Sequence, residues 1–124
     1  MNLYFLSSRS ARAIVLALTC VALATTASAM SLRELRGLAK TGKQGPDYLN
    51  YYLVGIMEGA LEAHAHAVRN GAAPTICLNG RRLEPFMAKS LFDTELKRNS
   101  DVYEADMTAQ LVMVNALSTV YSCQ

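Results

Sequence analysis

Apolar residues recur at helical spacing along most of the chain. Leu32, Leu35 and Leu38 lie three residues apart, and most of the charged residues nearby fall between them. Similar spacing, interrupted by Gly, Pro and Asn, predicts three further helices. The predicted helices cover residues 30–40, 47–71, 82–98 and 102–121. No stretch alternates apolar and polar residues over the length of a strand, so the pattern predicts an all-α, four-helix single domain.

Residue types at the ends of these segments indicate where the helices begin and end. Asp47, after Pro46, suits the cap of a first helical turn. Gly71 readily adopts the left-handed conformation that ends a helix. Asp101 and Glu104 have the spacing of a capping box, which predicts that the last helix begins near residue 102. The apolar side of the third helix is predicted to consist of Leu83, Phe86, Met87, Leu91 and Leu96.

Small residues form one line along the second helix. Gly55, Gly59, Ala63 and Ala67 are four residues apart and therefore share a helix face. Each glycine inside a helix costs about 1 kcal/mol relative to alanine, which indicates a packing role. We predict that this face packs closely against the last helix. The alternative is that the glycines are tolerated on an exposed face.

The first 29 residues have the organisation of a cleavable secretory signal peptide. Arg9 and Arg12 precede an apolar run at residues 13–24, and Ala27-Ser28-Ala29 forms an A-x-A cleavage site. Cleavage after Ala29 makes Met30 the first residue of the mature protein. Lipidation at Cys20 and an uncleaved membrane anchor are the weaker alternatives.

Removal of this segment changes the composition of the remaining domain, residues 30–124. The whole chain has 12 Lys and Arg and 10 Asp and Glu, and the two arginines of the signal peptide account for the difference. The mature domain therefore has no excess charge that would favour nucleic acid or an anionic membrane as a partner. It has 95 of the 124 residues, so its core is small. No segment after Met30 is apolar for long enough to cross a bilayer.

Two cysteines, Cys77 and Cys123, remain once Cys20 is removed with the signal peptide. In an exported domain, such a pair indicates one disulfide bond. The bond would close a loop of about 47 residues and contribute on the order of 4 kcal/mol by the chain-entropy argument. A redox-active thiol pair is the alternative, but such pairs usually have C-x-x-C spacing.

Three polar residues of the second helix are candidates for chemistry. Glu58, Glu62 and His66 lie four residues apart and could bind a metal or act as an acid–base set. We favour a solvated face with a Glu–His contact, because the HExxH spacing is absent and no third type of ligand is evident. We therefore expect no enzyme activity, no metal and no other cofactor.

Three tyrosines near the start of the same helix allow two interpretations. Tyr48, Tyr51 and Tyr52 could form an aromatic binding patch. The favoured interpretation is that their rings seal the core while their hydroxyls reach solvent.

Several short motifs occur in one order along residues 45–123. A Tyr-x-x-Gly-x-x-x-Gly helix begins at Tyr52, Thr75-Ile76-Cys77 follows in a loop, a helix ends near Leu96-Lys97, and Ala116-Leu117 precedes Cys123. Together with the signal peptide, this order resembles the Rap/Tai family of small periplasmic immunity proteins from type VI secretion. The family usually has proline soon after the loop cysteine, shortly after the third helix and immediately before the last cysteine. This chain departs from that pattern, because it has Leu78-Asn79, Asn99-Ser100 and Ser122 at these places.

The resemblance implies a compact helical fold with one disulfide and a role without catalysis. It also implies binding to a peptidoglycan amidase effector delivered by sibling cells, whose active-site groove the protein would block. We therefore expect a periplasmic protein with a protein partner, and the sequence does not identify the partner-binding residues. A homodimer is a further assembly to consider. The alternative function is a periplasmic stress-response chaperone, which a Met-rich, helical, exported chain also fits.

Overall fold

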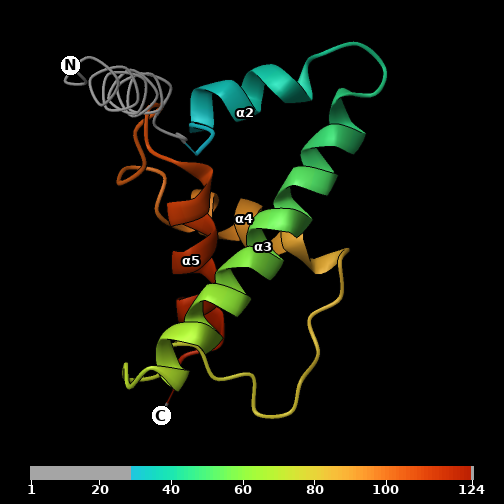
Figure 1. Ribbon diagram of the computed structural model, residues 1–124. Coiled ribbons are helices and arrows are strands. Elements are labelled where there is room, and N and C mark those ends of the chain that lie inside the picture. The colour runs from blue at the N-terminus through green and yellow to red at the C-terminus, as the bar shows by residue number, and fades with distance from the viewer. Residues whose placement is uncertain (1–28, 124) are drawn as a thin grey trace, which may run out of the picture.

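The computed structural model describes residues 29–123, and this part of the chain contains four helices. They are α2 (Leu32–Ala39), α3 (Gly45–Arg69), α4 (Met87–Arg98) and α5 (Ala109–Val120). The long α3 crosses the molecule diagonally, with α2 near its start and α5 and α4 behind it (Figure 1). Helix α3 contacts each of the other three helices, and α4 also contacts α5. The all-α prediction is confirmed.

The predicted signal peptide lies almost entirely outside the described residues. Residues 1–28, which include Arg9, Arg12 and Cys20, belong to that segment, and only Ala29 and Met30 of the cleavage site are described. The cleavage site and export therefore stay predictions. Within the described residues there is no strand, and two isolated antiparallel bridges join Ser31 to Thr108 and Ile76 to Ser122.

One stripe of α3 forms the centre of the core. Leu53, Ile56, Met57 and Ala60 are buried at helical spacing on the side that faces the other helices. They belong to one cluster with buried residues of α2, α4 and α5. Its largest fully buried members are Leu32, Leu53, Met57, Val112, Met113 and Leu117. Full burial of such a side chain contributes about 1.5–3 kcal/mol, so this shared cluster holds the four helices together.

The predicted packing role of the small-residue line is wrong. Gly55, Gly59, Ala63 and Ala67 are all exposed, and a Cβ atom added at either glycine would meet no other atom within 4 Å. The apolar residues at 53, 56, 57 and 60 are bulkier and lie on the other side of the helix. Their burial removes more apolar surface from water, so that side faces the core and the small residues face outward.

The first helix begins with a capping box. The Ser31 backbone N–H donates to Glu34 Oε2 at 2.7 Å, and the Glu34 backbone N–H donates to Ser31 Oγ at 3.3 Å. These bonds confirm a short amphipathic helix in the predicted place. Because the hydrogen bonds from Ser31 favour the ionised carboxylate, they lower the pKa of Glu34.

Helix α3 begins two residues earlier than predicted, and its first residue is Gly45. Asp47 therefore lies inside the first turn instead of capping it. A Cβ atom at Gly45 would lie 2.6 Å from the Leu38 carbonyl oxygen, which only glycine avoids. The predicted end is confirmed, because α3 stops at Arg69 and Gly71 has a φ of 94°.

The third and fourth helices begin later than predicted. Helix α4 starts at Met87 instead of near residue 82, because Pro85 disfavours the helical conformation of the residue before it. Helix α5 starts at Ala109, where Thr108 Oγ1 accepts the Leu111 N–H, so the predicted cap at Asp101 is wrong.

The segment before α5 is held in a non-helical conformation by α2. Backbone N–H groups of Leu32 and Arg33 donate to the carbonyls of Met107 and Ala105 at 2.9 and 2.8 Å, and Ala109 N–H donates to Met30. The Ala109 N–H is therefore used between segments, so it is not available to the Ala105 carbonyl, to which it would donate in a longer α5.

The predicted disulfide between Cys77 and Cys123 is confirmed. Their Cα atoms are 5.0 Å apart and the sulfurs 2.00 Å apart. The Cys77 N–H also donates to the Tyr121 carbonyl at 2.7 Å. The end of α5 is thereby fastened to the segment that follows α3.

We predict opposite effects of alanine at exposed and buried glycines. Gly59→Ala should raise the free energy of unfolding by about 0.5–1 kcal/mol, because alanine favours the helix and space is open there. Gly45→Ala should lower it, because the added methyl group meets the carbonyls of Leu38 and Ala39. Urea unfolding followed by circular dichroism measures both changes. A loss of stability in Gly59→Ala would contradict an open face.

We predict that loss of the disulfide destabilises the protein strongly. The double substitution Cys77→Ser and Cys123→Ser should lower the free energy of unfolding by about 2–5 kcal/mol, because the unfolded chain gains freedom. Denaturant unfolding measures the change. Reduction should shift the wild-type midpoint and leave the midpoint of the double variant unchanged. An unchanged wild-type midpoint after complete reduction would oppose this role.

Candidate functional site

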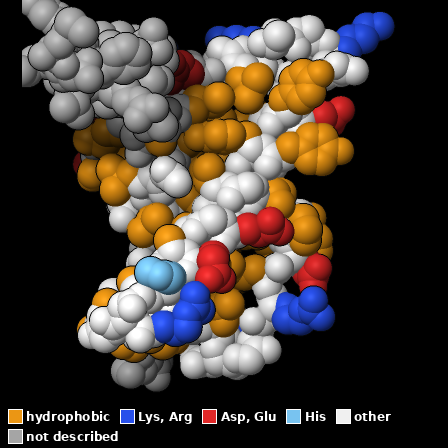
Figure 2. Space-filling model, in the orientation of Figure 1, with side chains coloured by type: hydrophobic (Ala, Val, Ile, Leu, Met, Phe, Trp, Pro, Cys, Tyr) orange, Lys and Arg blue, Asp and Glu red, His pale blue; other side chains and the backbone are white. Residues whose placement is uncertain are grey.

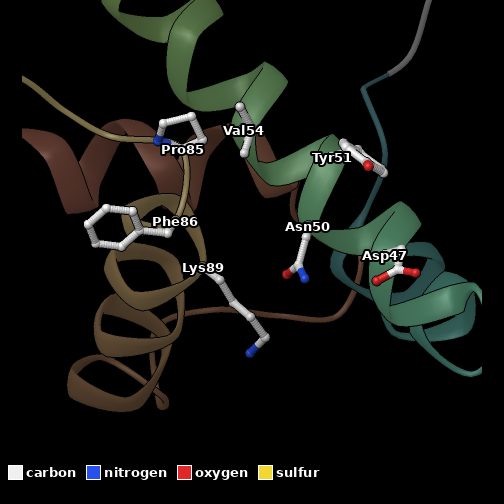
Figure 3. A pocket seen from close by; sticks show the side chains of 7 residues that line it. All are labelled: Asp47, Asn50, Tyr51, Val54, Pro85, Phe86 and Lys89. Atoms are coloured by element: carbon white, nitrogen blue, oxygen red, sulfur yellow. The ribbon is translucent and has the colours of Figure 1, made fainter.

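A groove lies between the N-terminal half of α3 and the start of α4. It has a volume of about 420 Å³. Its lining residues are Asp47, Asn50, Tyr51, Val54, Pro85, Phe86 and Lys89. The first four follow one another along one face of α3, and the last three lie where the chain enters α4 (Figure 3). Figure 3 shows Asn50 and Lys89 pointing into the gap between the two helices.

Two aromatic rings at this groove are unusually exposed. Tyr51 retains 76% and Phe86 81% of the accessible surface of the free residue. Phe86 precedes Met87 at the start of α4, and burial of Ala88 and Leu91 fixes that helix on the core side. Hydrophobic side chains gather over the first half of α3 in the space-filling view (Figure 2). Exposed aromatic surface of this kind is typical of interaction sites.

The polar side chains of the groove differ in whether they bond to another side chain of the protein. The ammonium group of Lys89 forms an ion pair with the carboxylate of Asp93 one helical turn away. Among the described residues, no side-chain hydrogen bond or ion pair engages Asp47 or Asn50. Asp47 lies in the first turn of α3, where the helix dipole favours a negative charge. The groove therefore contains one cation in an exposed ion pair, one carboxylate and one side-chain amide.

The three tyrosines near the start of α3 have different environments. Tyr51 is largely exposed at the groove, whereas Tyr52 is partly buried and packs against the core. Tyr48 is 49% exposed and its hydroxyl donates to Gln44 Oε1 at 2.7 Å. Packing against the core is therefore confirmed for the side chain of Tyr52 alone, and Tyr51 belongs to an exposed aromatic surface.

The predicted third helix included Leu83 and Phe86, but both lie before α4; Leu83 still packs against the core, whereas Phe86 is exposed. Its spacing assigns it to the apolar side of the third helix, and the later start of α4 puts it outside that helix instead. Pro85, immediately before it, was the available signal, because proline is common at the start of a helix and disfavoured inside one.

The structure does not bring Glu58, Glu62 and His66 together as a chemical site. Glu62 forms a 2.8 Å ion pair with Arg69, and this bond lowers the pKa of the Glu62 carboxyl. The His66 ring lies 3.3 Å from the Asn70 amide nitrogen. In residues 29–123, no group of three or more His, Cys, Asp or Glu side chains is placed to hold a metal ion.

His64 has a structural role that its position in the sequence did not predict. Its Nε2 atom accepts the backbone N–H groups of Thr75 and Ile76 at 3.0 and 3.2 Å. An accepting Nε2 has no proton, so the proton of the neutral ring is on Nδ1. A second hollow of about 450 Å³ lies beside this contact. Its lining residues are Glu58, Leu61, Glu62, His64, Ala65, Ile76 and Leu78.

A buried polar network lies between α4 and α5. Glu95 is only 3% exposed, and its Oε1 atom accepts from the Tyr103 hydroxyl at 2.7 Å and from Asn99 Nδ2 at 2.8 Å. Asn115 Nδ2 donates to the same tyrosine hydroxyl at 3.0 Å. Glu95 Oε2 has no hydrogen-bond partner, and the nearest cation is Arg98, whose Nη1 is 3.9 Å away.

This network fixes the loop between α4 and α5. Tyr103 lies in that loop, and its hydroxyl joins Glu95 of α4 to Asn115 of α5. Burial, together with the adjacent Glu95 carboxylate, raises the pKa of Tyr103. Helical spacing alone gave no sign of the network, because its members come from three segments.

Comparison with protein-family models finds no match for this chain, and comparisons with curated proteins and with solved structures find none. In residues 29–123, no helix has both the length and the apolar character that crossing a membrane requires.

We predict that removal of one hydroxyl group weakens this network. Tyr103→Phe should lower the free energy of unfolding by about 1–3 kcal/mol near neutral pH, because Glu95 and Asn115 each lose a partner. Tyr48→Phe is the matched control, since its hydroxyl contacts exposed Gln44 and its loss should change stability by less than about 0.5 kcal/mol. Urea unfolding measures both.

We also predict that the stability difference between wild type and Tyr103→Phe depends on pH. Because the pKa of Tyr103 is raised in the folded state, its contribution is complete below the unfolded value of about 10 and is lost as the pH rises through the folded value. The stability difference between wild type and Tyr103→Phe should therefore shrink above about pH 10. A constant difference from neutral to strongly alkaline pH would contradict this assignment.

Proposed function

We propose that this chain is an exported binding protein of the immunity type, which inhibits a peptidoglycan amidase effector of type VI secretion by occluding its active site. The class of partner comes from the resemblance of the short motifs to the Rap/Tai family. The observation that carries a binding role is the exposed groove with Tyr51 and Phe86 on its two sides. We propose the periplasm as its location.

The groove has properties expected of a protein-binding surface. Aromatic residues at the centre of an interface supply much of its binding energy, because they remove a large area from water at a low cost in side-chain entropy. Tyr51 is on α3 and Phe86 is at the entrance of α4, and both helices are anchored by buried residues. A partner would therefore meet a surface that is already formed, which reduces the entropy cost of binding.

The proposed activity does not require catalytic groups of this chain. An inhibitor of this type acts by filling the cleft of an enzyme, so its affinity depends on shape and buried area at the contact. The polar side chains of α3 that could have formed an acid–base set are engaged elsewhere, with Glu62 on Arg69 and His66 beside Asn70. This arrangement is compatible with a binding role and supplies no mechanism for hydrolysis.

A co-expression experiment tests the proposal. A peptidoglycan amidase effector of type VI secretion is expressed in the periplasm of a test bacterium, with and without this protein. We expect the wild-type chain to restore growth and to co-purify with the amidase. The double substitution Tyr51→Ala and Phe86→Ala should reduce co-purification by at least about tenfold, as expected when two central aromatic side chains are lost.

The control replaces exposed apolar residues outside the groove. Leu111 and Val120 of α5 are 44% and 41% exposed, so Leu111→Ala with Val120→Ala removes a similar kind of surface elsewhere. This control should protect as well as wild type, and both double variants should retain the helical circular dichroism signal. Failure of the wild-type chain to protect against the amidase or to bind it would reject the proposal.

A further inference from the structure

His64 joins two parts of the molecule that share little buried surface. We propose that this contact is sensitive to acid, and that protonation of the His64 ring separates the C-terminal half of α3 from residues 72–76, which stay attached to α5. The inference concerns a conformational change of this chain alone. It is therefore independent of the partner in the proposed function.

The C-terminal half of α3 has few other attachments. The buried residues of α3 end at Ala60, and none of residues 61–69 is buried. The ion pair between Glu62 and Arg69 lies within α3, so it does not join this half to another segment. Among the described residues, the side-chain hydrogen bonds between this half of α3 and residues 72–76 are the two that the His64 ring accepts.

The segment on the other side of the contact is fastened to α5 by bonds that do not titrate. Ile76 forms an antiparallel bridge with Ser122, and the Cys77 N–H donates to the Tyr121 carbonyl at 2.7 Å. The disulfide between Cys77 and Cys123 adds a covalent bond. None of these bonds uses a side chain that takes up a proton, so all of them persist in acid.

The contact itself requires the neutral ring. His64 Nε2 accepts the backbone N–H groups of Thr75 at 3.0 Å and of Ile76 at 3.2 Å. A protonated imidazole carries a proton on both nitrogens and has no acceptor. Its Nε2–H would face two N–H donors, so two hydrogen bonds would be replaced by a contact between donors. Separation lets water accept from all three groups.

The charged groups of α3 near His64 do not keep the contact closed in acid. Glu58 and Glu62 line the hollow beside the ring, and both are exposed. Their attraction for a protonated ring is screened by solvent and is present whether the contact is closed or open. Glu62 is in addition paired with Arg69, which reduces its net effect.

The segments packed against the ring bring no group that titrates in the same pH range. Residues 70–78 and 109–123 contain no ionisable side chain other than Tyr121 and the two cysteines of the disulfide. A tyrosine stays protonated in neutral and acidic solution. The guanidinium group of Arg81, which lies 4.9 Å from the centroid of the Tyr121 ring, stays charged throughout.

The second histidine of the chain provides an internal comparison. The protein has two histidines, His64 and His66, and an unperturbed histidine has a pKa of about 6.5. The His66 ring is exposed and lies 3.3 Å from the amide nitrogen of Asn70, at the end of the same helix. Protonation of His66 therefore breaks no contact between α3 and residues 72–76.

Amide hydrogen exchange measures the opening. The protein is purified after expression of the full-length gene, and exchange is followed by nuclear magnetic resonance at about pH 7.5 and pH 5, each rate being divided by the intrinsic rate at that pH. If the open ring takes up one proton and the closed ring none, the opening constant for Thr75 and Ile76 should rise about ten- to thirtyfold between these values. Val112 and Met113, in the core part of α5, should show no such rise.

Substitutions at the two histidines assign the effect. In His64→Gln, the side-chain amide oxygen can accept at every pH, so the two amides should stay protected and lose their pH dependence. In His64→Phe, which keeps a ring and has no acceptor, protection should be low at both pH values. His66→Gln is the matched control and should keep the wild-type pH dependence. All three variants should retain the helical circular dichroism signal.

Three results would overturn the inference. The first is protection of Thr75 and Ile76 in the wild type that does not change between the two pH values. The second is a pH dependence that survives in both His64→Gln and His64→Phe. The third is loss of the pH dependence in His66→Gln, which would assign the protonation to the other histidine.

Discussion

Burial of a single stripe of α3 is the constraint on which the arrangement of the molecule depends. Leu53, Ile56, Met57 and Ala60 provide the surface that α2, α4 and α5 share. Because these three helices all pack on one side, the opposite side of α3 is left in solvent along its length. The same packing places the start of α4 beside the first half of α3, and the groove with Tyr51 and Phe86 forms at that place.

Specific polar and covalent bonds then fix the connections between the helices. The disulfide of Cys77 holds the segment after α3 to the end of α5, and His64 accepts two backbone N–H groups of the same segment. The loop before α5 is held by the Glu95–Tyr103 bond and by backbone bonds to α2. In a domain with a small core, such bonds determine the positions of segments that contribute little buried apolar surface.

The buried core and the bonds between segments support the proposed binding role in different ways. The core and the fastened connections keep the groove formed in the absence of a partner, which lowers the entropy cost of association. The groove itself combines large exposed rings with acceptor groups that have no internal partner. In the proposed function, the rings would provide contact area and the polar side chains would provide selectivity.

The sequence alone determined the helical class, the disulfide partners, the α2 segment and the end of α3, because these follow from local spacing, residue chemistry and a two-cysteine count. Prediction from the sequence was wrong where a local preference competes with contacts between distant segments. Gly55 and Gly59 suggested close packing, yet bulkier residues on the other side of α3 gain more from burial. The start of α5, the bonds of His64 and Glu95, and the exposure of Phe86 depend on which segments meet in space, and only the tertiary structure decides that.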